Sequence, residues 1–322
     1  MDISHAINST HVDPTTEPPK KHGMDCNGFP LTIKQIAIHS CSGVTRELLP
    51  ALLSAIRLVH PKPWNIVLSN GLEHDRDDIL YVVICPAGLT LNQTKMPMYY
   101  INWQLEYLNG NYDNDVYIER LRGALANWDY SQFNIDICKN RYNIESIYVP
   151  PGFNEEVSSP DVLSGKYLYT DQGKDIDVLF LGWCDPFPRR LLIRDNCVRA
   201  GLKCWFVCGL DDHQMKQAIR RSKVCINIAT TDSFIFHKIR ISLLLSNQAC
   251  VVSESTIDRS SNLIYEENGV CVVPYDSVVE TVFELVQNFE LRRSMALKSY
   301  RWYRNTQRWT DIVDFNKLLP GT

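Results

Sequence analysis

Residues 221–254 contain two short apolar runs on either side of an amphipathic segment, and this pattern constrains the fold more than any other. Residues 224–229 and 249–253 are short, uninterrupted and rich in β-branched side chains, which is typical of parallel strands buried on both faces. Residues 234–246 have helical periodicity. We therefore predict a strand–helix–strand unit whose polar loops lie at the carboxyl edge of a parallel sheet, where such sheets bind ligands.

The second half of the chain repeats this alternation. Helices that separate short apolar strands produce right-handed βαβ units and a doubly wound sheet. Further strands are predicted at 176–181, 203–208 and 270–273, and further helices at 187–200, 212–221 and 276–288.

The first half has the same alternation in a less regular form, and Pro150, Pro151 and Gly152 end it with a stiff break. We predict an α/β protein with two Rossmann-like domains, whose parallel doubly wound sheets face a cleft and whose C-terminal helices cross back. Strands are predicted at 33–38, 64–68, 79–85, 98–103 and 147–149, and helices at 44–58, 115–127 and 131–142. The predicted division is a flexible leader (1–31), an N-terminal domain (32–155), a C-terminal domain (156–300) and a crossing helix and tail (301–322).

Composition excludes some partners. The formal charge of −4 and the pI near 6.1 argue against a broad nucleic-acid-binding surface. No run approaches the roughly 18 apolar residues of a membrane span, and the N-terminus lacks the pattern of a signal peptide. The eleven cysteines include no CxxC pair, which favours reduced thiols. We expect a cytoplasmic protein with no nucleic-acid partner and no membrane span.

Five segments carry a family resemblance. They are YINWQLEYL (100–108), NWDYSQFNI (127–135), YVPPGF (148–153), DVLFLGWCDPFPRR (177–190) and the stretch 221–254 that ends in CVVSE. In this order the chain resembles nucleotide-sugar glycosyltransferases of the two-Rossmann GT-B architecture (glycosyltransferase group 1), and within them the spore-maturation-type branch of bacteria and large DNA viruses.

The resemblance implies a reaction. A hexosyl or pentosyl group would pass from a nucleotide-sugar donor to a hydroxyl of a glycan or small-molecule acceptor. The acceptor would bind the N-terminal domain and the donor the C-terminal domain, with no cofactor beyond the donor itself. No acidic pair follows a strand in the manner of a DxD metal site, so we expect the reaction to be metal-independent, with cationic side chains and helix dipoles stabilising the leaving group.

Segment 177–190 supplies the first candidate donor-binding residues. A strand runs into Gly182, where the backbone can pass close to a ligand. Arg189 and Arg190 come at the start of the next helix, where guanidinium groups and the helix dipole would neutralise a diphosphate. Solvated charges at a helix start are the alternative interpretation.

The stretch 221–254 supplies the others. His237 and Arg240 are three residues apart and share a helix face. Arg240 matches the family pattern, whereas an acidic residue that holds the donor ribose commonly stands in the place of His237. Ser253 and Glu254 end the next strand and are candidates for binding ribose or sugar hydroxyls. The departure at His237 supports a second interpretation, a catalytically inactive GT-B-like nucleotide- or sugar-binding or scaffold protein.

The first domain supplies three candidates. His39 follows the first strand and is a candidate general base, because its unperturbed pKa is near 6.5. Gly43 would let backbone N–H groups approach the leaving phosphate. Glu106 matches an acidic position of the family and is the second candidate catalytic residue, as a carboxylate that takes the acceptor proton or orients the sugar.

Overall fold

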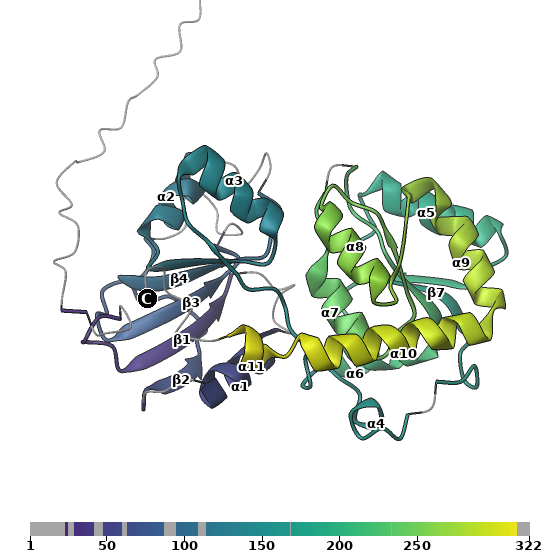
Figure 1. Ribbon diagram of the computed structural model, residues 1–322, viewed down its shortest axis with the longest axis horizontal. Helices are drawn as coiled ribbons and strands as arrows, with labels where there is room; N and C mark the ends of the chain where they lie inside the picture. The colour runs from purple at the N-terminus through teal and green to yellow at the C-terminus, as the bar shows by residue number, and fades with distance from the viewer. Residues whose placement is uncertain are drawn as a thin grey trace, which may run out of the picture.

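The computed structural model describes residues 23–24, 29–41, 48–59, 63–86, 95–108, 114–167, 169–232 and 234–313. Two parallel β-sheets organise these residues, one of six strands and one of five. We call each sheet with its covering helices a lobe. Figure 1 shows the first lobe on the left and the second on the right.

The first sheet has the strand order β2-β1-β3-β4-β5-β6, and all its pairings are parallel. Every residue of β3 and β4 is buried, as central strands covered by helices on both faces require. The strands are β1 (Gln35–Ser40), β2 (Asn65–Leu68), β3 (Ile79–Ile84), β4 (Tyr99–Gln104), β5 (Ala126–Asp129) and β6 (Ile147–Tyr148), and the helices are α1 (Leu49–Val59), α2 (Asp115–Gly123) and α3 (Gln132–Tyr142).

The second sheet has the order β11-β10-β9-β7-β8, again all parallel. Its strands are β7 (Ile176–Leu181), β8 (Cys204–Val207), β9 (Ser222–Asn227), β10 (Val251–Glu254) and β11 (Cys271–Val273). Its helices are α4 (Pro160–Leu163), α5 (Pro188–Arg199), α6 (Asp212–Arg221), α7 (Lys238–Ser246), α8 (Arg259–Glu267), the 3₁₀ turn η4 (Tyr275–Ser277) and α9 (Val278–Gln287).

Each sheet has one point at which the strand order reverses. In the first it lies between β1 and β3, and in the second between β7 and β9. Open α/β sheets bind ligands beyond the carboxyl ends of the strands at such a reversal. The order of the strands therefore marks one edge position in each lobe.

The last helices connect the lobes, as expected. α10 (Phe289–Thr306) runs along the second lobe, and α11 (Trp309–Ile312) lies beside α1 of the first (Figure 1). Trp309 packs edge-on against Trp103 of β4, with ring centroids 5.6 Å apart. The Tyr303 hydroxyl donates a hydrogen bond of 2.6 Å to the carbonyl of Pro151. The predicted limit between residues 300 and 301 falls inside α10. The domain limits given above stay predictions.

Several elements differ from the sequence predictions, among them α4 and β5, which were not predicted. The predicted helix 115–127 ends at Gly123, and the next residues form the short strand β5. The predicted helix 234–246 begins only at Lys238. Helix α8 was not predicted. β5 has four residues, of which two are polar, so it lacks the long apolar run that identifies a buried strand.

Candidate functional site

The reversal point of the second sheet is occupied by Arg240. Its Nε donates a hydrogen bond of 2.7 Å to the carbonyl of Leu181, at the end of β7, and its Nη1 donates one of 2.7 Å to Oδ1 of Asn227, at the end of β9. The guanidinium also lies over the ring of Phe180. Burial lowers the pKa of Arg240 to about 9. Arg240 therefore ties together the two strands between which the order reverses.

Gly182 is required by this arrangement. Its φ is +150°, which L side chains rarely adopt, and a Cβ at this position would lie 2.9 Å from Nη2 of Arg240. The close approach predicted for this glycine is thus made by a guanidinium group of the protein itself.

Arg189 and Glu254 meet at the same edge. α5 begins at Pro188, and the Arg189 side chain reaches the end of β10, where Nη2 donates a hydrogen bond of 2.5 Å to Oε2 of Glu254. Arg189 also pairs with Asp232 and lies 3.9 Å over the ring of Tyr275. Glu254 is buried and accepts a second hydrogen bond from the backbone N–H of Ala229. Burial raises the pKa of Glu254, and the charge of Arg189 opposes that rise.

Arg190 turns away from its neighbour. It is 4% exposed, and it donates hydrogen bonds to the carbonyls of Ile228 (3.1 Å) and Trp183 (2.6 Å). Burial lowers its pKa to about 10. The adjacent arginines that the sequence suggests as a pair thus have different surroundings. Arg189 lies among acidic side chains at the edge, and Arg190 holds the loops that follow β7 and β9.

Ser253 connects strands. It is fully buried, its hydroxyl accepts a hydrogen bond of 2.9 Å from Nδ2 of Asn227, and it donates to the carbonyl of Glu254. The polar side chains at this edge form one group, which we call the switch-point cluster. Its members are Arg189, Arg190, Asn227, Arg240 and Glu254.

His237 stands directly before α7 and next to this cluster. Its ring stacks on Phe234, with centroids 4.5 Å apart. Burial, together with the charges of Arg240 and Arg190, lowers its pKa well below the usual histidine value, so the imidazole is neutral at pH 7. Its Nε2 is buried and has no hydrogen-bond partner in the part of the chain that the structure describes.

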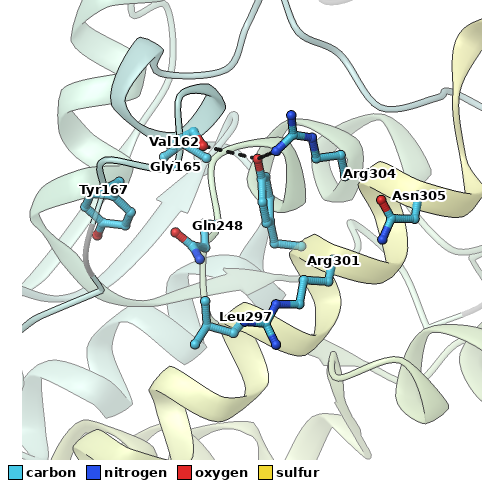
Figure 2. A pocket seen from close by; sticks show the side chains of 9 residues that line it. Val162, Gly165, Tyr167, Gln248, Leu297, Arg301, Arg304 and Asn305 are labelled. Carbon is cyan, nitrogen blue, oxygen red and sulfur yellow. Dashed lines mark hydrogen bonds between the residues drawn. The ribbon is translucent and has the colours of Figure 1, made fainter.

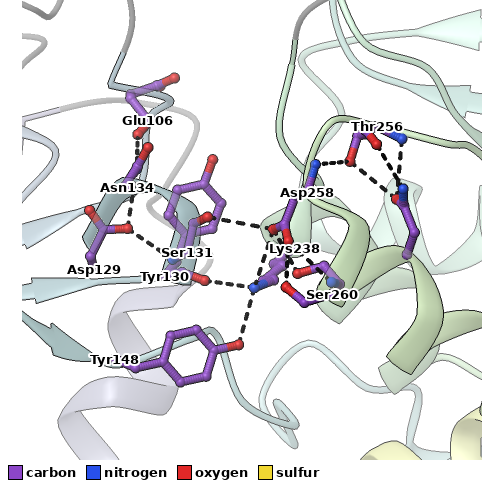
Figure 3. Close-up of polar contacts among 12 residues, drawn as sticks. Glu106, Asp129, Tyr130, Ser131, Asn134, Tyr148, Lys238, Thr256, Asp258 and Ser260 are labelled. Carbon is purple, nitrogen blue, oxygen red and sulfur yellow. Dashed lines mark hydrogen bonds and ion pairs between the residues drawn. The ribbon is translucent and has the colours of Figure 1, made fainter. Parts of the chain in front are cut away.

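Lys238 joins the two lobes and was not predicted. Its side chain is 3% exposed, and Nζ donates hydrogen bonds to the carbonyl of Tyr130 (2.9 Å) and to the hydroxyl of Tyr148 (3.1 Å). It lies 4.0 Å from Asp258, which caps α8. Figure 3 shows these contacts, of which those to Tyr130 and Tyr148 join the two lobes. A lysine at the start of a mostly apolar helix was the one signal in the sequence.

Glu106 lies just beyond β4, in the first lobe near this junction (Figure 3). Its backbone carbonyl accepts a hydrogen bond of 2.8 Å from Nδ2 of Asn134. Burial raises the pKa of the Glu106 carboxyl above the usual range. The same asparagine donates to Asp129, which is 2% exposed and also accepts from the N–H of Ser131. Burial raises the pKa of Asp129 well above its usual value.

The two remaining candidates of the first lobe are His39 and Gly43. His39 lies in β1, beside the reversal point of the first sheet, and its Nδ1 is 3.1 Å from the carbonyl of Ser69. Gly43 lies outside the described residues.

Among the residues that are described, no three His, Cys, Asp or Glu side chains form a group that could hold a metal ion. No helix in those ranges is long and apolar enough to cross a bilayer.

Solved structures match the fold along most of the chain. HepE of Anabaena, solved with UDP and glucose, matches with a TM-score of 0.58 and 11% identity over 87% of this chain and 97% of HepE. WaaG, a glycosyltransferase involved in lipopolysaccharide biosynthesis, matches with a TM-score of 0.55 and 10% identity over 89% and 100%. The fold is GT-B-like.

Another GT-B match is the DNA-modifying enzyme β-glucosyltransferase, with a TM-score of 0.52 and 15% identity over 86% of this chain and 97% of that protein. For one longer match, TarM, the chain covers 56% of that protein. No protein-family model and no curated protein sequence matches the chain. The GT-B fold is therefore recognised here from shape at identities of 9–15%.

Proposed function

We propose that this protein transfers a sugar from a nucleotide-sugar donor, bound at the switch-point cluster, to a hydroxyl of an acceptor bound on the first lobe. The observation that carries the proposal is the convergence of Arg189, Arg240 and Glu254 at the reversal point of a GT-B-like second sheet. This is the edge at which such sheets bind nucleotides. HepE and β-glucosyltransferase were solved with UDP or its glucose ester, so UDP-glucose is the first donor to test.

The charges of the cluster suit the departure of a nucleoside diphosphate. When the bond between the sugar C1 and the diphosphate oxygen breaks, the electron pair leaves with the diphosphate and negative charge develops there. Arg189 and Arg240 supply positive charge at this edge without a metal ion. The paired carboxylates of Glu254 and Asp232 would lose some of their contact with Arg189 as phosphate oxygens bind.

Glu106 would accept the proton from the acceptor hydroxyl as that oxygen bonds to C1. A raised pKa brings a glutamate closer to neutral pH, which improves its strength as a general base. His39 is the second candidate for this role. Its Nδ1, if protonated, donates to the Ser69 carbonyl, which leaves Nε2 as the basic atom.

Two observations favour the alternative of an inactive nucleotide- or sugar-binding or scaffold protein. Protein acceptors already engage Arg189, Arg190 and Arg240, and the neutral His237 stands where the family commonly has an acid. Such a protein would bind a nucleotide without turning over the donor.

A donor screen separates these functions. Thermal unfolding and calorimetry would be run with UDP, GDP, ADP and UDP-glucose, and product release from UDP-glucose would be followed with and without sugar acceptors and DNA. A ligand at 100 times its Kd should stabilise the protein by about 2.7 kcal/mol. Stabilisation with transfer or slow hydrolysis supports the transferase, and stabilisation without either supports the alternative. No binding of any of these nucleotides would contradict the transferase and leave the sugar-binding or scaffold protein as the alternative.

Variants place the donor. Arg189→Ala should abolish the stabilisation by UDP. Arg199→Ala, which changes an exposed arginine on the same helix, should retain it. If Arg189→Ala binds UDP normally, the donor does not occupy the switch-point cluster.

The ten described cysteines are all free, which supports a reducing compartment such as the cytoplasm.

A further inference from the structure

A polar cavity lies between the segment around α4 and the helix α10, away from the switch-point cluster. Its volume is about 470 Å³, within the usual range for pockets that bind small molecules. Figure 2 shows Gln248, Arg301 and Arg304 among the side chains that line it. Tyr167 and Leu297 add apolar surface to the lining.

The cavity carries positive charge without acidic partners in its lining. Arg301 and Arg304 are its only charged lining residues, and they are three apart on one face of α10. Among the described residues, neither forms an ion pair. The nearby Asp161 is paired with Arg220. Glu155 lines a separate cavity of about 420 Å³ that Arg304 also borders, but Arg301 does not line that one.

Arg304 is held in a defined orientation. Its Nη1 donates a hydrogen bond of 3.2 Å to the hydroxyl of Tyr300, which in turn donates one of 3.3 Å to the carbonyl of Val162. The nitrogens Nε and Nη2 of Arg304 have no acceptor among the described residues. A guanidinium group fixed in this way needs little further ordering to bind an anion.

The helix dipole explains a basic residue at the position of Arg304 but not at that of Arg301. Basic residues in the last turn of a helix complement its dipole, and Arg304 stands in the last turn of α10. This does not explain why Arg301 borders the same cavity, or why the polar side chains of Gln248 and Asn305 also line it.

We propose that this cavity binds a phosphomonoester of about the size of a sugar phosphate. Arg304 would bind the phosphate through Nε and Nη2, because the paired N–H groups of a guanidinium match phosphate oxygens, and Arg301 would add positive charge elsewhere in the lining. The amides of Gln248 and Asn305 would hydrogen-bond hydroxyl groups, and Tyr167 and Leu297 would cover the apolar face of the ligand. This site is independent of the proposed transfer reaction.

Helix α7 separates the two sites. His237 and Arg240, at its start, belong to the switch-point region, whereas Gln248 follows its end at Ser246. A helix of nine residues is about 13 Å long. One ligand of this size does not span both places, so occupancy of the cavity and of the cluster can be measured separately.

The test uses the full chain with glucose 6-phosphate, inorganic phosphate and glucose as probes, followed by calorimetry and thermal unfolding. Glucose 6-phosphate should bind saturably, and more tightly than either of the other two. The double variant Arg301→Ala/Arg304→Ala should weaken this binding at least tenfold and leave UDP binding unchanged. Arg199→Ala, the matched control, and Arg189→Ala should both keep the binding of glucose 6-phosphate.

Three results would overturn the proposal. They are the absence of binding at millimolar glucose 6-phosphate, binding that survives the double variant, and equal affinity for glucose 6-phosphate and inorganic phosphate. If the double variant does not fold, Arg301→Glu replaces it, because Arg301 is exposed and reversal of its charge should repel the phosphate. Unchanged affinity in that folded variant would equally contradict the site.

Discussion

Lys238, the first residue of α7 in the second lobe, donates a hydrogen bond of 2.9 Å to the backbone carbonyl of Tyr130 in the first lobe. Both residues are almost fully buried. A charged group in such a place is retained only where several acceptors surround it. This contact, with that to Tyr148, makes the start of α7 a polar link between the lobes.

Lys238→Met should therefore destabilise the protein by about 3–5 kcal/mol, because it leaves the buried carboxylate of Asp258 without its cation. Denaturant unfolding measures the change. Lys139→Met is the matched control. It removes an exposed ion pair with Glu145 and should cost less than about 1 kcal/mol. Equal effects of the two changes would show that the contact does not hold the lobes together.

Asp232→Asn should tighten the binding of UDP several-fold. The Asp232 side chain is 86% exposed and competes for Nη1 of Arg189, so neutralising it weakens that competition and removes repulsion of the diphosphate, while Nη2 stays paired with Glu254. Calorimetry at low salt gives the affinity, because screening weakens exposed charges. Asp212→Asn, which changes an exposed ion pair with Lys216 on α6, should leave the affinity unchanged. Weaker binding by Asp232→Asn would mean that this carboxylate itself contacts the ligand.

Gly182→Ala should destabilise the second lobe by about 1–3 kcal/mol and weaken donor binding. The φ of +150° disfavours any side chain, and the new Cβ would displace the guanidinium of Arg240. Thermal unfolding and UDP calorimetry report the two effects. Gly71→Ala meets no atom within 4 Å and should be close to neutral. A normal affinity for UDP in a folded Gly182→Ala protein would separate Arg240 from the donor site.

Glu106→Gln should abolish transfer while UDP binding is retained, because the amide keeps the shape of the side chain but cannot take a proton. In the unchanged protein the rate should rise with pH as Glu106 loses its proton, and the midpoint should lie above the usual glutamate range. A pH–rate profile with the donor identified in the screen measures this. Gln132→Glu, on the exposed start of α3, serves as the control. Full activity of Glu106→Gln would move the role of base to His39.

Asp129→Asn should remove a pH dependence of stability. Burial raises the pKa of Asp129 in the folded state, so this carboxyl favours folding at acidic pH and its contribution is lost as pH rises through that raised pKa. The asparagine Oδ1 can still accept from Ser131. Denaturant unfolding from pH 4 to pH 8 should therefore show a smaller decline for the variant. A steeper decline would contradict the assigned direction.

Much of the second lobe could be predicted from the sequence, because its strands are short apolar runs with helices between them. The start of α7 could not. Residues 234–237 have helical periodicity, but Phe234 and His237 stack on each other before the helix begins. That contact depends on neighbours that no local pattern reveals.

The roles of the arginines illustrate the same limit. Successive residues at a helix start point in directions about 100° apart, so adjacent side chains meet different surroundings. Pro188 at the first position of α5 is a signal that the sequence does contain. Which of Arg189 and Arg190 reaches Glu254 depends on where β10 ends, and that is settled only by the packing of the sheet. Lys238 was missed because its partners lie 90 to 108 residues away in the chain.

Lys238 and Arg240 are two residues apart on one rigid helix, and this has a mechanical consequence. If the lobes rotate apart, either the hydrogen bonds of Lys238 break or the whole turn of α7 moves with the first lobe. In the second case Arg240 is drawn out of the gap between β7 and β9. Rotation of the lobes would thus move the guanidinium group of Arg240 directly, because no loop lies between it and Lys238.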